Sequence, residues 1–339
     1  MKKKSSKRKK PTVFVKLPSL KTTEVFDDYW RFAAERQAIF FKRLGNSPYP
    51  WTKDGILQEY KFTNTYRASD RVSQYLIKRI IYEGEQSPKE IFFRIIFFKT
   101  FNKIETWELL YKKLGGITYK DYSFERYDKA FRSIIKSGKN IYSGAYIMAS
   151  GGKAFSYPRK YQNHLKLLEL MIKKEVPAKI VELKSLQKLF ELLKSFPTIG
   201  NFLAYQYAID INYSELTNFD EQDFVVPGPG ARDGIHKCFS NIGEIDEAEV
   251  IKMMADKQEK EFERLNIKFK TLWGRPLKLI DCQNLFCEVD KYARLKYPNI
   301  KGLSGRTRIK QRFKMNSDLI EYWYPPKWGI NECFKDGVK

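Results

Sequence analysis

Apolar residues recur at helical spacing along most of the chain, and this pattern predicts a mainly α-helical protein. The long amphipathic or apolar segments cover residues 24–45, 88–114, 246–270 and 281–296. Strand-like alternation is scarce, and no fixed period indicates a solenoid repeat. We expect the first two helices to end at Gly45 and Gly115, because glycine commonly terminates helices.

The centre of the chain, residues 185–235, has the pattern of a helical hairpin. Leucines at helical spacing fill residues 186–193, a turn follows, and apolar residues resume at Phe202. Pro197 cannot continue a helix, and Gly200 tolerates the tight backbone of a turn. Free amides at the start of a second helix carry the positive end of its dipole and can hold a DNA phosphate. Taken alone, this stretch is explained equally well as an ordinary corner between two helices and as a phosphate-binding hairpin.

The charge balance indicates a polyanionic partner. The chain has 339 residues, with Lys+Arg 63 against Asp+Glu 40 and a net charge of +23. It is 42% hydrophobic and 15% aromatic, which excludes a disordered basic protein. A folded protein this basic usually meets nucleic acid, and abundant aromatic residues favour bases that are stacked or flipped. The alternative explanation of the positive charge is that it serves solubility.

The cysteines and histidines do not indicate a metal site. Four cysteines form no CxxC pair, and there are only two histidines. Ligand spacings of zinc or iron–sulfur sites are absent, as is the GxxxxGK[ST] phosphate loop. We therefore expect no metal and no cofactor. Without a secretory signal or an apolar run of membrane length, we expect a cytoplasmic protein with no membrane partner.

We expect a disordered basic tail at residues 1–12 and a single helical domain at 13–339. The domain divides into two lobes in this prediction. One lobe covers about 51–215 and contains the hairpin, and 13–50 joins 216–339 in the other.

Polar groups interrupt the apolar segments where a base could be held by its hydrogen-bonding edge. Asn64, Arg67 and Asp70 lie in the segment after Trp51, and Arg94 lies in the most apolar stretch. A buried arginine must find an anion or several acceptors. Ordinary structural pairing explains each of these residues too. For Arg94 the partner would be Glu59 or Asp70.

An enzyme that acts on one base must turn that base out of the stack and usually needs one carboxylate. The candidate acids, in order of preference, are Asp223, Asp210 and Asp233. Asp223 lies in a loop before a helix start, Asp210 on the second hairpin helix, and Asp233 near a helix N-terminus. Each of them alone also has a structural explanation.

Two regions are candidates for contacts with the DNA backbone. In the hairpin these are Thr198, Gly200 and Asn201. A basic stripe within 301–314 adds Arg306, Arg308, Lys310 and Arg312, which are typical of a phosphate clamp.

With these residues in view, the chain resembles the alpha-glutamyl/putrescinyl thymine pyrophosphorylases and the related helical domain of 5-hydroxymethyluracil DNA kinases. The matching stretches are PWTKDGILQEYKFTNTYRASDR, FFRIIFFKTFN, FPTIGNFLAYQYAIDINY, DFVVPGPGARDG, LFCEVDKYAR and GRTRIKQ, within about 24–312. The resemblance implies a two-lobed fold of the helix-hairpin-helix DNA glycosylase superfamily, with a flipped pyrimidine between the lobes. It implies a base pocket containing Asn64, Tyr66, Arg67, Asp70, Arg94 and Asn102. The catalytic aspartate of glycosylases has no clear equivalent, because the Pro227-Gly228 turn occupies the closest position.

The expected partner is double-stranded DNA carrying a modified pyrimidine. Two enzymes fit: a glycosylase that excises a hydroxymethylated or glycosylated base, for instance in anti-phage defence, and a transferase that replaces a pyrophosphorylated hydroxymethyl group with an amine. The glycosylase is favoured by analogy of fold. A non-catalytic reader of modified DNA is a third alternative.

Overall fold

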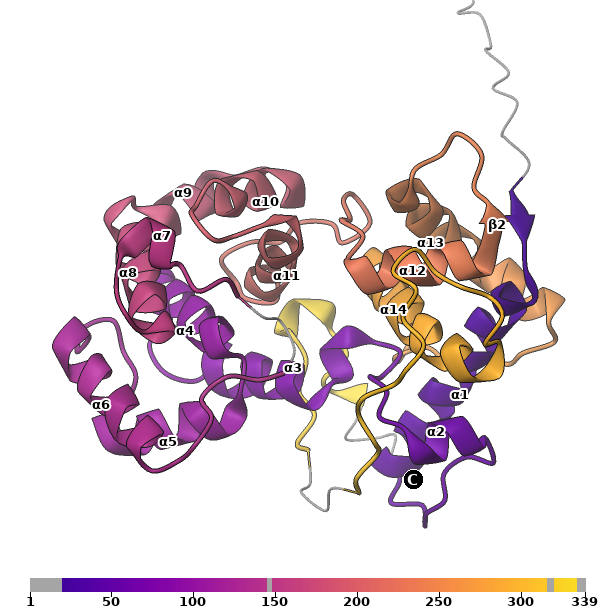
Figure 1. Ribbon diagram of the computed structural model, residues 1–339, viewed down its shortest axis with the longest axis horizontal. Coiled ribbons are helices and arrows are strands. Elements are labelled where there is room, and N and C mark those ends of the chain that lie inside the picture. The colour runs from indigo at the N-terminus through magenta and orange to yellow at the C-terminus, as the bar shows by residue number, and fades with distance from the viewer. Residues whose placement is uncertain (1–19, 145–147, 316–319, 334–339) are drawn as a thin grey trace, which may run out of the picture.

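The computed structural model describes residues 20–144, 148–315 and 320–333, and the predicted basic tail at 1–12 lies outside them. The fold is mainly α-helical, as the pattern predicts (Figure 1). The α-helices are α1 Glu24–Leu44, α2 Gly55–Glu59, α3 Arg71–Tyr75, α4 Pro88–Phe101, α5 Ile104–Leu114, α6 Phe124–Lys136, α7 Gly152–Phe155, α8 Lys160–Lys173, α9 Val176–Glu182, α10 Leu186–Lys194, α11 Asn201–Asn212, α12 Pro229–Cys238, α13 Glu247–Arg264 and α14 Leu279–Lys296. Short 3-10 helices are η1 Arg67–Ser69 and η3 Pro326–Trp328, and η2 Leu76–Ile81 is a π-helical turn. The strands β1 Lys21–Thr22 and β2 Phe239–Asn241 pair antiparallel.

The helices form two groups that lie side by side in Figure 1. Helices α4–α11 make one group, in which the α10–α11 hairpin packs near α4. Helices α1 and α12–α14 make the other, with α12 packed along α14. The lobe boundaries expected from the sequence, about 51–215 for one lobe and 13–50 with 216–339 for the other, stay a prediction. Among the described residues, no helix is long and apolar enough to cross a membrane.

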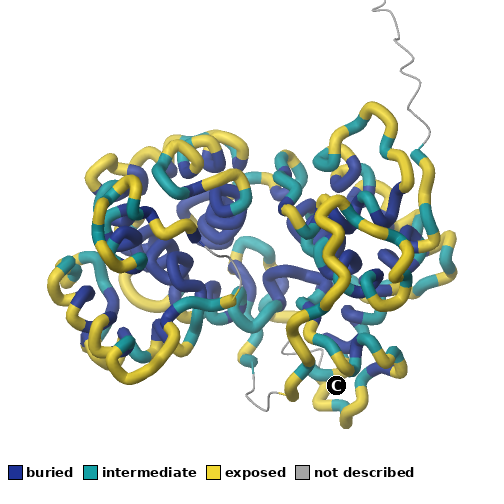
Figure 2. Tube along the Cα trace, viewed as in Figure 1, coloured by how far each residue is buried: buried dark blue, intermediate teal, exposed yellow. Residues whose placement is uncertain are grey.

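Helices α4 and α11 form the centre of their group. Every residue from Glu90 to Phe101 of α4 is buried, and α11 is buried from Leu203 to Asn212 (Figure 2). A helix covered on all sides needs no polar face, which explains why α4 is apolar all round. Polar side chains on these two helices must therefore find partners inside the protein.

The expected single helix over 88–114 is wrong, because the chain divides it into α4 and α5. Asn102 takes the left-handed conformation, with φ 48°, and terminates α4. Asparagine tolerates this conformation, and Lys99 Nζ donates to its Oδ1 at 2.8 Å. Likewise the helix expected over 246–270 ends at Arg264, before Asn266 with φ 53°.

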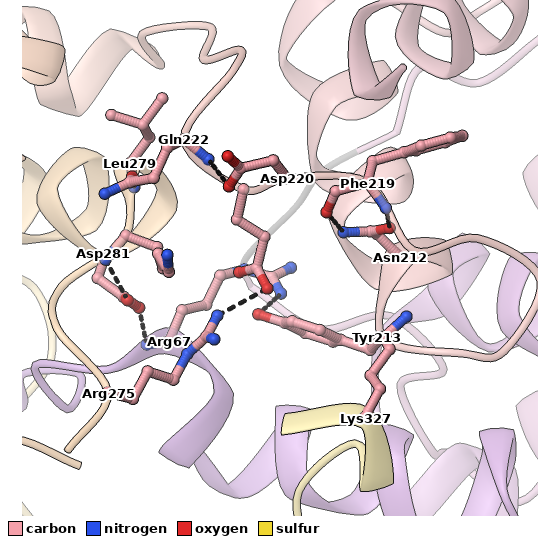
Figure 3. A network of polar contacts seen from close by, with 12 residues as sticks. Arg67, Asn212, Tyr213, Phe219, Asp220, Gln222, Arg275, Leu279, Asp281 and Lys327 are labelled. Carbon is pink, nitrogen blue, oxygen red and sulfur yellow. Dashed lines mark hydrogen bonds and ion pairs between the residues drawn. The ribbon is translucent and has the colours of Figure 1, made fainter. Parts of the chain in front are cut away.

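A buried arginine connects the two groups of helices (Figure 3). The backbone N–H of Arg67 donates to Asp281 Oδ1 of α14 at 2.8 Å. Its guanidinium lies 2.8 Å from Asp210 Oδ1 and donates to Gln206 Oε1 at 3.1 Å, both on α11. The ion pair is almost fully excluded from water, with side-chain exposures of 3% and 1%. The segment around η1 thus joins two helices that are far apart in the sequence.

Replacing Arg67 with Met should lower the free energy of unfolding by about 3–5 kcal/mol, because it leaves the buried Asp210 carboxylate short of a cation. Arg79→Met is the control, since its pair with Glu83 is about half exposed, and it should change stability by less than about 1 kcal/mol. Urea denaturation of both variants measures the difference. Equal losses of stability would contradict a structural role for the buried pair.

Candidate functional site

A cavity of about 490 Å³ lies beside the end of α1, between the segment 49–71 and the chain at 312–315. A short backbone pairing forms its rim: Lys61 N donates to Gln311 O at 3.0 Å, and Phe313 N donates to Glu59 O at 2.9 Å. This pairing brings the end of the basic stripe against residues remote in sequence. The volume lies within the range that holds a small organic ligand.

The lining of this cavity is strongly positive. Its cationic side chains are Arg36, Arg43, Lys61, Arg71, Arg312 and Lys314. Asp70 carries the only carboxylate among the described lining residues. Arg312 pairs with Glu59, which lies outside the lining. Within the described part of the chain, no acidic side chain forms an ion pair with Arg43, Lys61 or Lys314. Such a surface favours an anionic ligand.

The carboxyl group of Asp70 is strongly perturbed. Burial raises its pKa to about 7, although a hydrogen bond from the Asn64 backbone and the charge of Arg36 oppose the rise. Asn64 N donates to Asp70 Oδ1 at 2.8 Å, and Asn64 Nδ2 donates to Ser69 O at 2.7 Å. Arg36 in turn donates to Asn64 Oδ1 at 3.2 Å. A carboxyl group with a pKa near neutral pH, held in a cavity, is typical of a proton-transfer site.

Aromatic rings form one wall of the cavity. The rings of Tyr49 and Phe313 are almost parallel, with centroids 6.3 Å apart and planes at 11°. Trp51 is nearly perpendicular to both, at 89° to Tyr49 and 83° to Phe313. The guanidinium of Arg43 lies 5.0 Å from the centroid of Trp51. Cationic and aromatic groups therefore share one surface, as in sites that bind nucleotides.

The structure brings two of the expected base-pocket residues, Asn64 and Asp70, into this cavity. Tyr66 is buried elsewhere and donates to Arg275 O at 2.6 Å. Arg67 belongs to the junction between the groups, and Asn102 terminates α4. These last three residues line neither described cavity.

Arg94 lies in the lining of a second cavity, of about 840 Å³. The structural alternative, a buried pair with a carboxylate, is found for this residue, but the partner is neither Glu59 nor Asp70. Its guanidinium instead donates to the carbonyl oxygens of Ile80 and Glu85, both at 2.8 Å, and lies 3.9 Å from Glu90 Oε2. The second cavity mixes cationic side chains with Glu83, Glu85, Glu108 and Glu321, so it lacks the single charge sign of the first.

None of the three candidate catalytic acids lines either described cavity. Asp223 is exposed. Asp210 is buried between Arg67 and Lys99 Nζ, at 2.8 and 3.1 Å. Burial lowers the pKa of Lys99, and Asp210 opposes this shift.

Asp233, the third candidate acid, accepts hydrogen bonds from Ser304 N, at 2.8 Å, and from Ser304 Oγ. Burial acts to raise its pKa, but these hydrogen bonds and the charge of Arg306 leave it below the ordinary value. Asp233 therefore stays ionised and anchors the chain at the beginning of the basic stripe.

The hairpin turn lies at the surface, with Gly200 and Asn201 exposed. Gly200 has an extended backbone, φ −83° and ψ 175°, so the turn does not use its conformational freedom. Thr198 takes the strained positive φ instead, at 70°. Gly200 matters here because it lacks a side chain: apart from its chain neighbours, nothing lies within 4 Å of the place where a Cβ would stand, and no side chain caps α11. The amides that begin α11 are thus open to an approaching phosphate.

The basic stripe is exposed at Arg306, Arg308, Lys310 and Arg312. Its backbone is held by Arg294, whose guanidinium donates to Arg308 O at 2.8 Å. Arg312, at the end of the stripe, also lines the cavity. A surface that attracts phosphates therefore leads directly to the candidate site.

Sequence reasoning missed the arginines and the aromatic wall of the cavity. Arg36 and Arg43 lie on the first amphipathic helix, where charge is ordinary. Tyr49 and Trp51 flank Pro50 in what reads as a rigid connector, and Phe313 interrupts the basic stripe. The sequence feature that could have indicated the aromatic wall is the aromatic residue within each of these polar or proline-containing segments.

The pKa of Asp70 predicts a pH effect on stability. The unfolded carboxyl releases its proton near its ordinary pKa, about 4, whereas the native carboxyl keeps its proton to about 7. Between these values the native state binds more protons, so the free energy of unfolding should fall as the pH rises. Asp70→Asn should remove this part of the slope. Urea denaturation across the window, for wild type and variant, measures it.

Comparison of the two proteins isolates Asp70, because Asp281, whose pKa burial raises to about 6, is present in both. Asp223→Asn is the control for the loss of one carboxylate, since this side chain is exposed. An Asp70→Asn variant with the wild-type slope would contradict the assignment.

Among the described residues, no group of three or more histidine, cysteine or acidic side chains is arranged to hold a metal.

Comparison with known proteins gives a clear family. Residues 23–302 match the family described as "5-hmdU DNA kinase, helical domain". The chain is 27% identical over 328 residues to the 5-hmdU DNA kinase of Bacillus phage SP10, covering 89% of this chain and 50% of that protein. The chain thus spans about half the length of this curated relative. No solved structure matches significantly. The placement in the glycosylase superfamily stays a prediction, but the resemblance to the kinase helical domain is confirmed: this chain belongs to the 5-hmdU DNA kinase helical-domain family.

Proposed function

We propose that this chain is an enzyme that draws a modified pyrimidine out of double-stranded DNA into the Asp70 cavity and acts on it there. The relative's name supports a modified deoxyuridine as substrate. The exposed stripe and the open amides of α11 supply contacts for phosphates on the duplex. Base extrusion is the general solution for chemistry on a base inside a duplex.

The reaction that this site favours is transfer of an amine to a pyrophosphorylated hydroxymethyl group on the base. The observation that carries this choice is the lining itself, to which the described residues contribute six cationic side chains and one carboxylate. The amine nitrogen forms a bond to the exocyclic methylene carbon, and the bond from that carbon to oxygen breaks. Pyrophosphate leaves with the electron pair, and the cations stabilise its negative charge.

Asp70 accepts the proton that the attacking amine releases. Its pKa of about 7 suits this role, because a general base works best when its pKa lies near the operating pH. Asn64 fixes one carboxyl oxygen through its backbone N–H, which leaves the other oxygen for the substrate.

Excision of the base by a glycosylase is the second candidate, because the same carboxyl group can activate a water molecule. It is less favoured than transfer for two reasons. Hydrolysis of the glycosidic bond has no use for so many cations, and Asp223, Asp210 and Asp233 lie outside the cavity. A non-catalytic reader of modified DNA would need no group with the pKa of Asp70.

The test uses duplexes that carry thymine, 5-hydroxymethyluracil or its diphosphate ester, incubated with glutamate or putrescine. Mass spectrometry of the digested nucleosides should show amine addition only on the diphosphate ester. Alkali-labile sites would instead support the glycosylase, and tight binding without reaction would support a reader.

Asp70→Asn should lower the rate of transfer by about 100-fold or more, because it removes the proton acceptor. The matched control, Asp223→Asn, changes an exposed carboxyl outside the cavity and should retain the wild-type rate. Binding of the duplex by Asp70→Asn shows that the variant is folded. Full activity of this variant would exclude Asp70 as the base.

The stripe should contribute affinity that does not depend on base sequence. Replacing Arg306 and Arg308 with Gln should reduce the slope of log affinity against log salt by about 0.9 for each DNA phosphate that the variant no longer neutralises. A double replacement of Lys129 and Lys188, which are exposed on α6 and α10, serves as the charge-matched control. An equal change of slope in both variants would show that net charge, rather than the stripe, governs binding.

A further inference from the structure

Three aromatic side chains at the cavity are arranged as a box. Tyr49 and Phe313 supply two nearly parallel plates, and Trp51 lies across them at 5.3 Å and 6.3 Å from their centroids. The plates come from separate segments, residues 49 and 313, and the backbone bond from Phe313 N to Glu59 O holds one of them. Tyr49 is 44% exposed, so the box is accessible from solvent.

We propose that Tyr49 and Phe313 sandwich the nucleobase, with Trp51 closing the slot at the base edge. Stacked bases lie about 3.4 Å apart, so a base between two rings needs about 6.8 Å. The centroids of Tyr49 and Phe313 are 6.3 Å apart. The planes of two parallel rings are no farther apart than their centroids, so the exposed Tyr49 ring must move outward to admit one planar ring.

A cationic occupant, which aromatic boxes otherwise attract, does not fit this position. Arg43 already lies over Trp51, and Lys61, Arg312 and Lys314 line the same cavity. A second positive charge would be repelled by these groups. A neutral base that carries phosphate groups satisfies both features, because the rings take the base and the cations take the phosphates.

This inference deepens the proposed function, since the base in the slot would be the extruded pyrimidine. A free nucleotide has the same chemistry and is the other source of a base. Tyr49 and Phe313 then determine substrate orientation: they hold the pyrimidine ring in the cavity that Asp70 and Asn64 also line.

The experiment measures the Kd of wild type for 5-hydroxymethyl-dUMP by calorimetry and for a duplex containing 5-hydroxymethyluracil by fluorescence anisotropy. Tyr49→Leu and Phe313→Leu should each weaken binding about 10-fold, because each removes one stacking face. Tyr49→Phe and Phe313→Tyr should restore affinity to within about 2-fold, since a stacking face remains. Tyr111→Leu is the control, as Tyr111 is 53% exposed and lines the other cavity.

The outcomes separate this inference from the proposed function. If both leucine variants bind the free nucleotide more weakly than wild type does, the slot is supported. If wild type at the same time binds the modified duplex no better than the plain duplex, the proposed action on extruded bases is overturned. Leucine variants that bind and react like Tyr111→Leu overturn the slot and leave the proposed enzyme intact. Because Tyr49 is a surface residue, its leucine variant should stay folded and keep the wild-type urea midpoint. The test therefore remains valid even if Phe313→Leu destabilises the protein.

Discussion

One buried guanidinium connects the parts of this protein. Arg67 contacts Asp210 and Gln206 of α11 with its side chain, and its backbone N–H contacts Asp281 of α14. A charge in such a place is stable only when its acceptors are complete, because the protein interior solvates ions poorly. The relative position of the two groups of helices is therefore determined by a polar contact as well as by apolar packing.

The same contact bears on the candidate site. Asp70 follows Arg67 by three residues and terminates the short η1 helix, so both residues lie on one short segment. Helix α11 carries the open amides of the hairpin at its start and Asp210 in its last turn. Helix α11 thus extends from the surface that we expect to meet DNA to the Asp210 carboxylate that pairs with Arg67.

The division of charge in the molecule fits an enzyme for DNA bases. Exposed arginines on the stripe attract the backbone, whereas the cavity concentrates cations around one carboxyl group of raised pKa. The attraction of the stripe for phosphates does not depend on the base sequence. In the proposed function, the groups in the cavity act on one substituent of the base. The family relationship adds that a chain of this type forms about half of a larger phage kinase.

The sequence by itself determined the helical class, the hairpin with its open turn, the exposed basic stripe and the family, because each depends on periodicity or on contiguous residues. It also indicated Asn64 and Asp70. Tertiary structure alone decided which polar residues reach the cavity. Tyr66, Arg67 and Asp210 look equally available in the sequence, yet they are buried, since Arg67 pairs with Asp210 and Tyr66 donates to the carbonyl oxygen of Arg275. The aromatic wall combines residues 49 and 51 with residue 313, and only the backbone pairing of 59–61 with 311–313 brings these segments together. A contact of such long range leaves no periodic trace in a single chain, because either segment alone satisfies the same local pattern.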